Sequence, residues 1–258
     1  MTTARRPIDQ AHRDAVTGIH RIVANGTNGY AVGLGISALA VNTADTTVGI
    51  GYEAGKANTS GSHNVSVGYG AGWLTSTGGY NTFIGALAGR VNTTGQFNMF
   101  LGYYSGYNNS THSYNTFIGA QSGRYSTANY NTFIGGLSAF GITTGASNTA
   151  IGYQAARYLA DGSTANQTSA NGTYLGYEVR ASAAGAANET AIGNGAIGGG
   201  SNTVRLGNAA VTHWLPGATD TTYLGNTTHG FKALYLHDGT DEWAVTINAS
   251  GTLVTTKV

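Results

Sequence analysis

The feature that most constrains the fold of this chain is a short phrase that is repeated at a nearly fixed distance. The phrase Tyr-Asn-Thr-Phe-Ile-Gly begins at Tyr80 and recurs, with small changes, at Phe97, Tyr114 and Tyr130. Self-similarity at a fixed period predicts structural units that stack on one another, each covering a surface that its neighbour could not bury alone. The repeat therefore limits the fold to a stacked architecture before any single residue is considered.

The glycine that ends the phrase recurs most regularly, and we call it the anchor glycine. An aliphatic residue precedes each anchor, and most anchors are 16 or 17 residues apart. One gap is long, from Gly152 to Gly176, and one is short, from Gly193 to Gly207. The anchors are Gly35, Gly51, Gly68, Gly85, Gly102, Gly119, Gly135, Gly152, Gly176, Gly193 and Gly207.

The residue types within the repeat favour strands over helices. Gly, Asn and Thr recur in each unit and are poor helix formers, whereas Thr-Phe-Ile is β-branched and aromatic and is followed by Gly. A period of this length suits one coil of a β-solenoid. We therefore predict an all-β fold with a parallel β-roll over residues 30–207, in which equivalent residues form columns with a spacing of about 4.8 Å.

The composition agrees with a repetitive β-protein. Only 9% of the 258 residues are charged, compared with about 25% in ordinary globular domains. No apolar run approaches the roughly 20 residues that span a bilayer, and the chain has no Cys, so disulfides do not stabilise it. A net charge of +1 without a basic stripe argues against nucleic-acid binding. We expect neither nucleic-acid binding nor membrane insertion.

An asparagine lies four residues before six of the anchors and forms a column of its own. Asn side chains stacked in register can hydrogen-bond along the stack. We therefore predict an Asn ladder that ties successive coils together. Its members are Asn64, Asn81, Asn98, Asn115, Asn131 and Asn148.

Two adjacent columns of the predicted strand are apolar: the aliphatic column and the Phe column before it. Neighbouring strand residues point to opposite faces, so one column fills the coil and the other leaves it. An apolar stripe outside a thin coil would be avoided by a soluble monomer, which predicts a homo-oligomer, with three copies as the simplest closed prism. The residues predicted for the trimer core are Phe83, Phe100, Phe117 and Phe133.

A further column, five residues after the anchor, alternates between cations and aromatic rings. At the spacing of stacked strands an Arg can lie over the next ring, which stabilises by roughly 0.5–1 kcal/mol when exposed. The column is either a stabilising corner or a groove for a receptor or glycan, since aromatic rings stack on sugars. After Lys56, it contains Trp73, Arg90, Tyr107, Arg124, Phe140 and Arg157.

The two ends of the chain depart from the repeat. In residues 1–29, Ile8, Ala11, Ala15, Ile19 and Ile22 are spaced for a short amphipathic helix. After the last anchor, residues 208–258 contain three alternating runs separated by Asp-Gly and Ser-Gly turn signals, which predict a small antiparallel β-meander. Within the roll, residues 158–172 fill the long gap and read as a surface loop.

At this point the repeats resemble known families. Asn-Thr-Ala-Ile-Gly at Asn148–Gly152 and Glu-Thr-Ala-Ile-Gly at Glu189–Gly193 look like the head repeat of YadA-type trimeric adhesins. The longer Asn-Thr-Phe-Ile-Gly units and residues 231–239 look like segments of bacteriophage tail fibre proteins. The resemblance implies a left-handed trimeric β-roll, although the period here is two or three residues longer than in the adhesins.

The resemblance also implies a function in host attachment. We expect a non-enzymatic fibre of a virion tail or capsid, which acts outside the host cell and meets a host-surface glycan or protein. Residues 1–29 are then a docking segment for other tail or baseplate proteins, with Arg5, Arg6, Arg13 and Arg21 as its cations. The alternatives are the head of a bacterial trimeric adhesin and an ice-binding β-solenoid.

Nothing in the sequence forms a persuasive catalytic or cofactor site. Gly193-x-Gly195-x-x-Gly198 matches a dinucleotide fingerprint, but no helical pattern follows it. His237, Asp238, Asp241 and Glu242 form the densest ionisable cluster, which is best interpreted as a polar hairpin turn. We predict no enzyme activity, metal or cofactor, because preorganised titratable groups are sparse.

Overall fold

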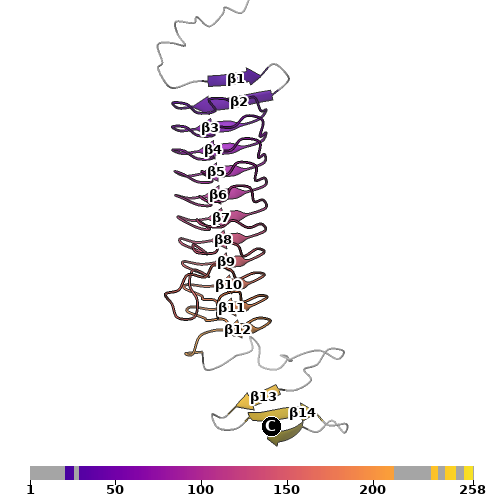
Figure 1. Cartoon of the computed structure of the whole chain (residues 1–258). Helices are drawn as coiled ribbons and strands as arrows, with labels where there is room; N and C mark the ends of the chain where they lie inside the picture. The colour runs from indigo at the N-terminus through magenta and orange to yellow at the C-terminus, as the bar shows by residue number, and fades with distance from the viewer. Residues whose placement is uncertain (1–20, 26–28, 212–233, 238–241, 248–252, 258) are drawn as a thin grey trace, which may run out of the picture. The chain divides into compact units, whose positions relative to one another are not determined.

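In the computed structural model, the described residues are 21–25, 29–211, 234–237, 242–247 and 253–257 (Figure 1). They belong to two compact units, Met1–Val211 and Thr212–Val258, each taken here by itself. The strands of the first unit are β1 (Arg21–Asn25), β2 (Gly29–Leu34), β3 (Val48–Ile50), β4 (Val65–Val67), β5 (Thr82–Ile84), β6 (Met99–Leu101), β7 (Thr116–Ile118), β8 (Thr132–Ile134), β9 (Thr149–Ile151), β10 (Thr173–Leu175), β11 (Thr190–Ile192) and β12 (Val204–Leu206).

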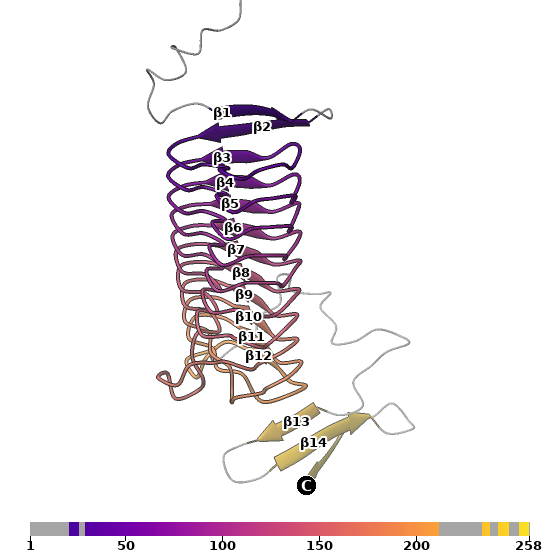
Figure 2. The same cartoon turned by 45° about the horizontal axis from the view of Figure 1, so that its top comes forward.

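The first unit is a β-solenoid in which each coil contributes one strand to a single sheet. The twelve strands follow one another in chain order, and from β2 to β12 every neighbouring pair is parallel (Figure 2). Successive strands start about one repeat apart. At about 4.8 Å per strand, this sheet is roughly 50 Å long. The predicted all-β solenoid of coils near 17 residues is confirmed.

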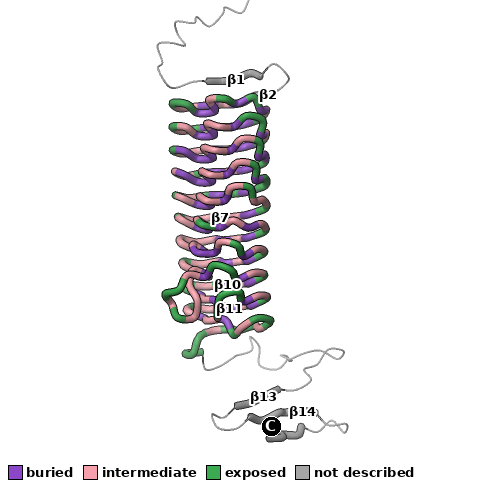
Figure 3. The backbone as a smooth tube through the Cα atoms, viewed as in Figure 1, coloured by how far each residue is buried: buried purple, intermediate pink, exposed green. Residues whose placement is uncertain are grey.

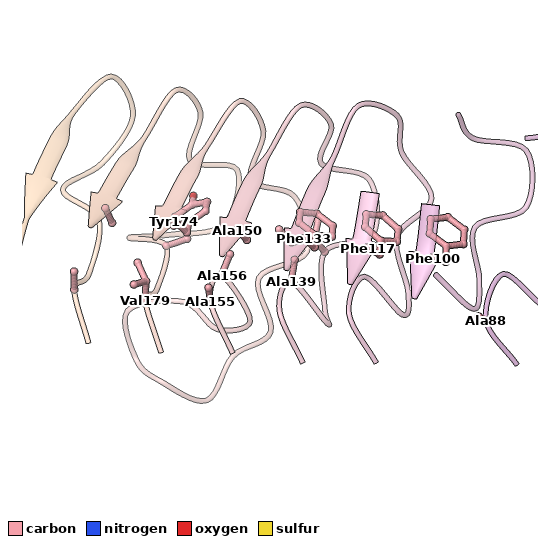
Figure 4. Packing of buried hydrophobic residues seen from close by; sticks show 14 of the residues in the cluster. Ala88, Phe100, Phe117, Phe133, Ala139, Ala150, Ala155, Ala156, Tyr174 and Val179 are labelled. Atoms are coloured by element: carbon pink, nitrogen blue, oxygen red, sulfur yellow. The ribbon is translucent and has the colours of Figure 1, made fainter. Parts of the chain in front are cut away.

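The register places like residues over like. Phe83 pairs with Phe100, Phe100 with Phe117, and Phe117 with Phe133. The rings stack at 4.8–5.3 Å between centroids (Figure 4). Equivalent positions therefore form continuous columns, as the repeat predicts.

The Phe column fills the inside of the coil, so the prediction that it forms the core of a trimer is wrong. Phe83, Phe100, Phe117 and Phe133 are each 0% exposed in the single chain. The column that leaves the coil is the aliphatic one, and Leu101 is 40% exposed. Buried positions run through the inside of the stack, and exposed positions lie along its outside (Figure 3).

Small residues facing the Phe rings explain why this column turns inward. A Cβ on Gly106 would lie 2.5 Å from the ring of Phe100, and a Cβ on Gly123 would lie 2.7 Å from the ring of Phe117. The residue six positions after each Phe is small: Gly89, Gly106, Gly123 and Ala139. Each ring and the small residue that faces it thus share one inner volume, as close packing requires.

The anchor glycines are needed because coils meet there backbone to backbone. Gly102 has a φ of +133°, and a Cβ on it would lie 2.6 Å from the carbonyl of Gly119 in the next coil. Its N–H donates to the carbonyl of Ile84 in the preceding coil at 2.7 Å. A side chain at this position would be strained and would also push the coils apart, so only Gly fits.

The Asn ladder is present, and its hydrogen bonds run from side chain to backbone. Asn98 Oδ1 accepts from the N–H of Asn115 at 3.0 Å, and Asn98 Nδ2 donates to the carbonyl of His112 at 2.8 Å. Asn81 Oδ1 accepts from the N–H of Asn98 in the same way. Each Asn therefore satisfies backbone groups in the next coil. All six predicted members are buried: Asn64, Asn81, Asn98, Asn115, Asn131 and Asn148.

The N-terminal end of the sheet is closed by an antiparallel strand. β1 pairs with β2, with Ile22 opposite Val32. The predicted helix is therefore wrong at Arg21 and Ile22, because this segment completes the sheet edge, which would otherwise leave backbone groups unpaired. Among the cations predicted for docking, Arg21 lies in β1; Arg5, Arg6 and Arg13 lie outside the described residues.

The second unit contains the predicted antiparallel meander. Its strands are β13 (Leu234–His237), β14 (Glu242–Ile247) and β15 (Leu253–Lys257), in the sheet order β13-β14-β15. His237 pairs with Glu242 at the start of the first hairpin. These strands match the three alternating runs of the sequence, and the unit begins at Thr212, close to the predicted boundary at residue 208.

Replacing Asn98 with Ala should lower the free energy of unfolding by about 2–4 kcal/mol, because two backbone groups would each lose a hydrogen-bond partner. Chemical denaturation followed by circular dichroism measures the change. Thr94→Ala is the matched control, since Thr94 is exposed just before the same turn, and it should change stability by less than about 0.5 kcal/mol. Equal stabilities of the two variants would contradict the ladder's role.

Candidate binding surfaces

The outward face of the parallel sheet is uncharged, and it combines an aliphatic column with a column that is mostly Thr. In each strand from β3 to β12 the first and third residues point outward, and none of these outward residues is charged. In β6 they are Met99 and Leu101, exposed by 46% and 40%. In β5, Thr82 and Ile84 occupy the same positions. A continuous face of this kind is rare on soluble monomers and marks an interaction surface.

A second exposed column is aromatic, and the sequence analysis did not single it out. Its rings stack at 4.7–5.3 Å with interplanar angles of 3–11°. Because the ring faces cover one another, the column presents mainly ring edges to solvent. We call it the aromatic ladder, and it consists of His63, Tyr80, Phe97, Tyr114 and Tyr130.

The backbone of the aromatic ladder is strained. Its five residues have φ values between +55° and +61°, a conformation that costs bulky residues about 1–3 kcal/mol. Three later coils place Asn171, Asn188 and Asn202 at the same point of the repeat, also with positive φ. Asn adopts this conformation more readily. The aromatic residues are therefore retained against backbone preference, and their stacking offsets part of the strain at about 0.5–1.5 kcal/mol per pair.

The predicted alternation of cations and rings is present along one corner of the roll, and we call this column the corner spine. Arg90 Cζ lies 4.8 Å from the ring centroid of Trp73 and 6.0 Å from that of Tyr107. Arg124 Cζ lies 5.9 Å from the centroid of Tyr107 and 6.0 Å from that of Phe140. Because each of these rings has a cation from both neighbouring coils close to it, little of either ring face remains accessible for stacking on a sugar. This geometry favours the stabilising role for the rings.

At both ends of the corner spine a cation also lies close to an aromatic ring. Arg157 Cζ lies 5.1 Å from the centroid of Phe140 and 4.7 Å from that of Tyr158. At the other end, Lys56 Nζ lies 5.8 Å from the Trp73 centroid and forms an ion pair with Glu53. The side chains of the spine are half-buried, so the cations are held in place by the rings between them.

The predicted surface loop leaves the stack after Tyr158 and returns before β10. A bridge from Tyr158 to Ala165 closes it, and Asp161 accepts hydrogen bonds from the Thr164 hydroxyl and from the N–H groups of Ser163 and Thr164. These bonds lower the pKa of Asp161 to about 2. The loop is therefore an ordered turn around one carboxylate.

Beside this loop is a polar hollow of about 190 Å³. Arg180 donates from Nη1 to the carbonyl of Ala160 at 3.0 Å, which ties the hollow to the loop. The volume suits a small polar group. Its lining residues are Gln154, Tyr158, Gly162, Glu178 and Arg180.

One buried carboxylate was missed by sequence reasoning. Glu189 occupies the Asn position of its coil and is 0% exposed. The Tyr174 hydroxyl donates to Glu189 Oε2 at 3.1 Å, and the N–H of Gly200 donates to Oε1 at 2.8 Å. Burial raises the pKa of Tyr174 above its usual range. The sequence does contain a signal for this site: Glu189 replaces Asn in the Asn column, and Tyr174 replaces Phe in the Phe column of the neighbouring coil.

The glycine fingerprint is explained by this buried carboxylate. A Cβ on Gly198 would collide with the Glu189 carboxylate, so Gly198 leaves room for it. No helix follows Gly198 within residues 29–211, so the dinucleotide interpretation fails. In the hairpin cluster, Asp238 and Asp241 lie outside the described residues.

The part of the chain that the structure describes contains few other candidate sites. There, no group of three or more His, Cys, Asp or Glu side chains could hold a metal ion, and no helix is long and apolar enough to cross a membrane. Comparisons with protein-family models, with curated proteins and with solved structures gave no match. The functional assignment therefore depends on the surfaces described above.

Replacing Tyr114 with Asn should change the free energy of unfolding by less than about 1 kcal/mol, since relief of backbone strain offsets the lost stacking. Phe117→Ala, in the same coil, is the contrasting variant and should cost about 3–5 kcal/mol. Denaturant titration of both variants measures the difference. A large loss for Tyr114→Asn would assign the aromatic ladder to stability instead of recognition.

Proposed function

We propose that this chain forms the rigid trimeric rod of a bacteriophage tail fibre or a similar virion appendage, and that it mediates attachment to a host surface outside the cell. The rod has no catalytic role in this proposal. The observation that carries it is the uncharged outward face along β3 to β12 with its continuous aliphatic column. A face of this length is best explained as a seam between sister chains.

The seam is formed by the outward columns of the sheet. Leu101 and Leu175 are 40% and 41% exposed in the single chain, and each fully buried aliphatic side chain contributes about 1.5–3 kcal/mol. Three flat sheet faces packed around one axis would cover all three seams, and the coil would be left-handed as in the adhesin-like repeats. In this arrangement the aliphatic column takes the role first predicted for Phe83, Phe100, Phe117 and Phe133.

Such a rod suits attachment because it is stiff and displays the same surface at every coil. Hydrogen bonds from coil to coil, such as those of the Asn ladder, resist bending and stretching. Residues 1–29 would dock the rod to other tail or baseplate proteins, and the outer columns would meet a host glycan or protein. The head of a bacterial trimeric adhesin would have the same architecture and is the alternative assignment.

Ice binding is a second candidate because a Thr column lies beside the aliphatic column. Thr82, Thr116 and Thr132 occupy the same outward position in β5, β7 and β8. Only one Thr per coil is regular, however, whereas a flat array of paired Thr would favour ice. A thermal-hysteresis measurement distinguishes the two functions, and the virion proposal expects no hysteresis.

Leu101→Lys should dissociate the assembly without unfolding the chain, because it places a charge on the seam and leaves the coil interior unchanged. Light scattering should give three times the 26.4 kDa chain mass for the parent and a smaller mass for the variant. The matched control is Thr94→Lys, which adds the same charge at an exposed turn position and should remain trimeric.

Circular dichroism of Leu101→Lys should retain the β-sheet spectrum. A monomeric parent chain at micromolar concentration would rule out the proposed rod. Equal masses for Leu101→Lys and the parent would show instead that another surface forms the contact.

A further inference from the structure

The charges of the middle coils are confined to the corner spine. Between Glu53 and Asp161 the chain has no Asp or Glu. The only Lys and Arg residues in that interval are Lys56, Arg90, Arg124 and Arg157. All four lie five residues after an anchor, so they share one column. The expectation that the chain has no basic stripe is therefore corrected: a sparse stripe exists, and low overall charge concealed it.

The cations occupy every second coil. Trp73, Tyr107 and Phe140 fill the coils between them. Two strand spacings separate neighbouring cations by about 10 Å. The stacked rings hold the half-buried guanidinium groups at this interval. The stripe is consequently a rigid row of positive charges with a fixed period.

The guanidinium groups of this row are largely unpaired. Within residues 29–211, only Lys56 has a carboxylate partner. Arg90 donates to the Tyr107 hydroxyl at 3.5 Å, and Arg124 donates to Gln121 Oε1 at 3.0 Å. Nε of Arg124 and Nε of Arg157 are buried without a hydrogen-bond partner among the described residues, so the Nη groups are the donors that can face an external ligand. Each Arg therefore retains Nη donors for an external ligand, whereas Lys56 is already paired with Glu53.

We propose that the corner spine binds a linear acidic polysaccharide with one carboxylate on every second sugar, laid along the rod so that successive carboxylates meet successive cations. This inference rests on the proposed function and specifies the receptor. Arg suits the role because its planar fork can donate two parallel hydrogen bonds to one carboxylate. The row binds through its guanidinium groups, and the rings act as spacers.

The spacing disfavours a nucleic acid. A nucleic-acid strand carries a charge about every 3.4 Å along a duplex, which is far denser than a cation about every 10 Å. Four cations would neutralise few phosphates. A polysaccharide with one carboxylate on every second sugar carries its charges at a wider interval than a nucleic acid, closer to that of the cations.

Isothermal titration at low ionic strength tests the proposal with hyaluronan fragments, in which uronate alternates with a neutral sugar. We expect binding that weakens as salt is added, and no binding of neutral dextran. Failure to bind hyaluronan would overturn the proposal, as would binding of dextran. Binding of single-stranded DNA as tightly as hyaluronan would also overturn it, in favour of a nucleic acid.

Three variants test the row itself. Arg124→Gln should weaken hyaluronan binding about threefold to fivefold, the size of one exposed ion pair. Arg124→Lys, which keeps the charge but loses the planar fork, should restore only part of the binding. Arg205→Gln, outside the row, is the matched control and should bind as the parent does. Equal losses for Arg124→Gln and Arg205→Gln would overturn the proposal. Arg90→Gln replaces Arg124→Gln if the latter fails to fold.

The fixed interval is tested by exchanging two neighbours. The double variant Tyr107→Arg with Arg124→Tyr retains the net charge and the aromatic content but moves one cation by one coil. Its thermal midpoint and mass establish that it folds and assembles. Hyaluronan binding should fall as in Arg124→Gln, and parental affinity would overturn the spacing.

The outcomes separate this inference from the proposed function. A trimer that adsorbs to host cells but does not bind hyaluronan overturns the polysaccharide inference alone. A monomer that binds hyaluronan overturns the trimeric rod alone.

Discussion

The whole roll depends on hydrogen bonds that run along its axis from one coil to the next. From β3 to β12 each strand is only three residues long, so sheet pairing alone covers a small part of each coil. Side chains extend the pairing: the hydroxyls of Thr59, Ser76 and Thr93 donate to carbonyls of the following coil at 3.0–3.1 Å. With the Asn ladder, these bonds fix the register of nearly every turn. The coils can then be thin, because axial bonding compensates for a small apolar core.

The sequence predicts this axial order well, because a residue that must match its own copy recurs at a fixed period. The anchor glycines, the Asn ladder and the alternating spine all follow from counting, and the structure contains each of them. Counting could not show which of the two apolar columns faces the inside of the coil, because alternation indicates only that Phe100 and Leu101 point to opposite sides. The deciding signal was Gly106, which leaves room for the Phe100 ring. That contact joins positions six residues apart across the coil, so the alternation of residues within one strand does not reveal it.

The aromatic ladder was missed for a related reason. Sequence patterns report which residues are apolar, but backbone strain appears only once φ is known. Tyr114 has a φ of +61°, where Asn202 at the equivalent point of a later coil has +62°. The same backbone therefore accepts both side chains. Ring stacking at about 5 Å makes the strained choice tolerable, because each ring in the ladder contacts the next.

In-register stacking also explains why the chain carries so little charge. A charged residue repeated in every coil would lie about 4.8 Å from its own copy, and like charges at about that distance repel by about 1 kcal/mol even in water. The penalty accumulates along the column, so acids and bases are excluded from most positions. Placing Trp73 between Lys56 and Arg90, and Tyr107 between Arg90 and Arg124, doubles the separation and turns repulsion into cation–ring attraction. One cation in every second coil is thus the closest spacing of like charges that such a stack readily accepts. This spacing produces the regular row of cations along the corner spine.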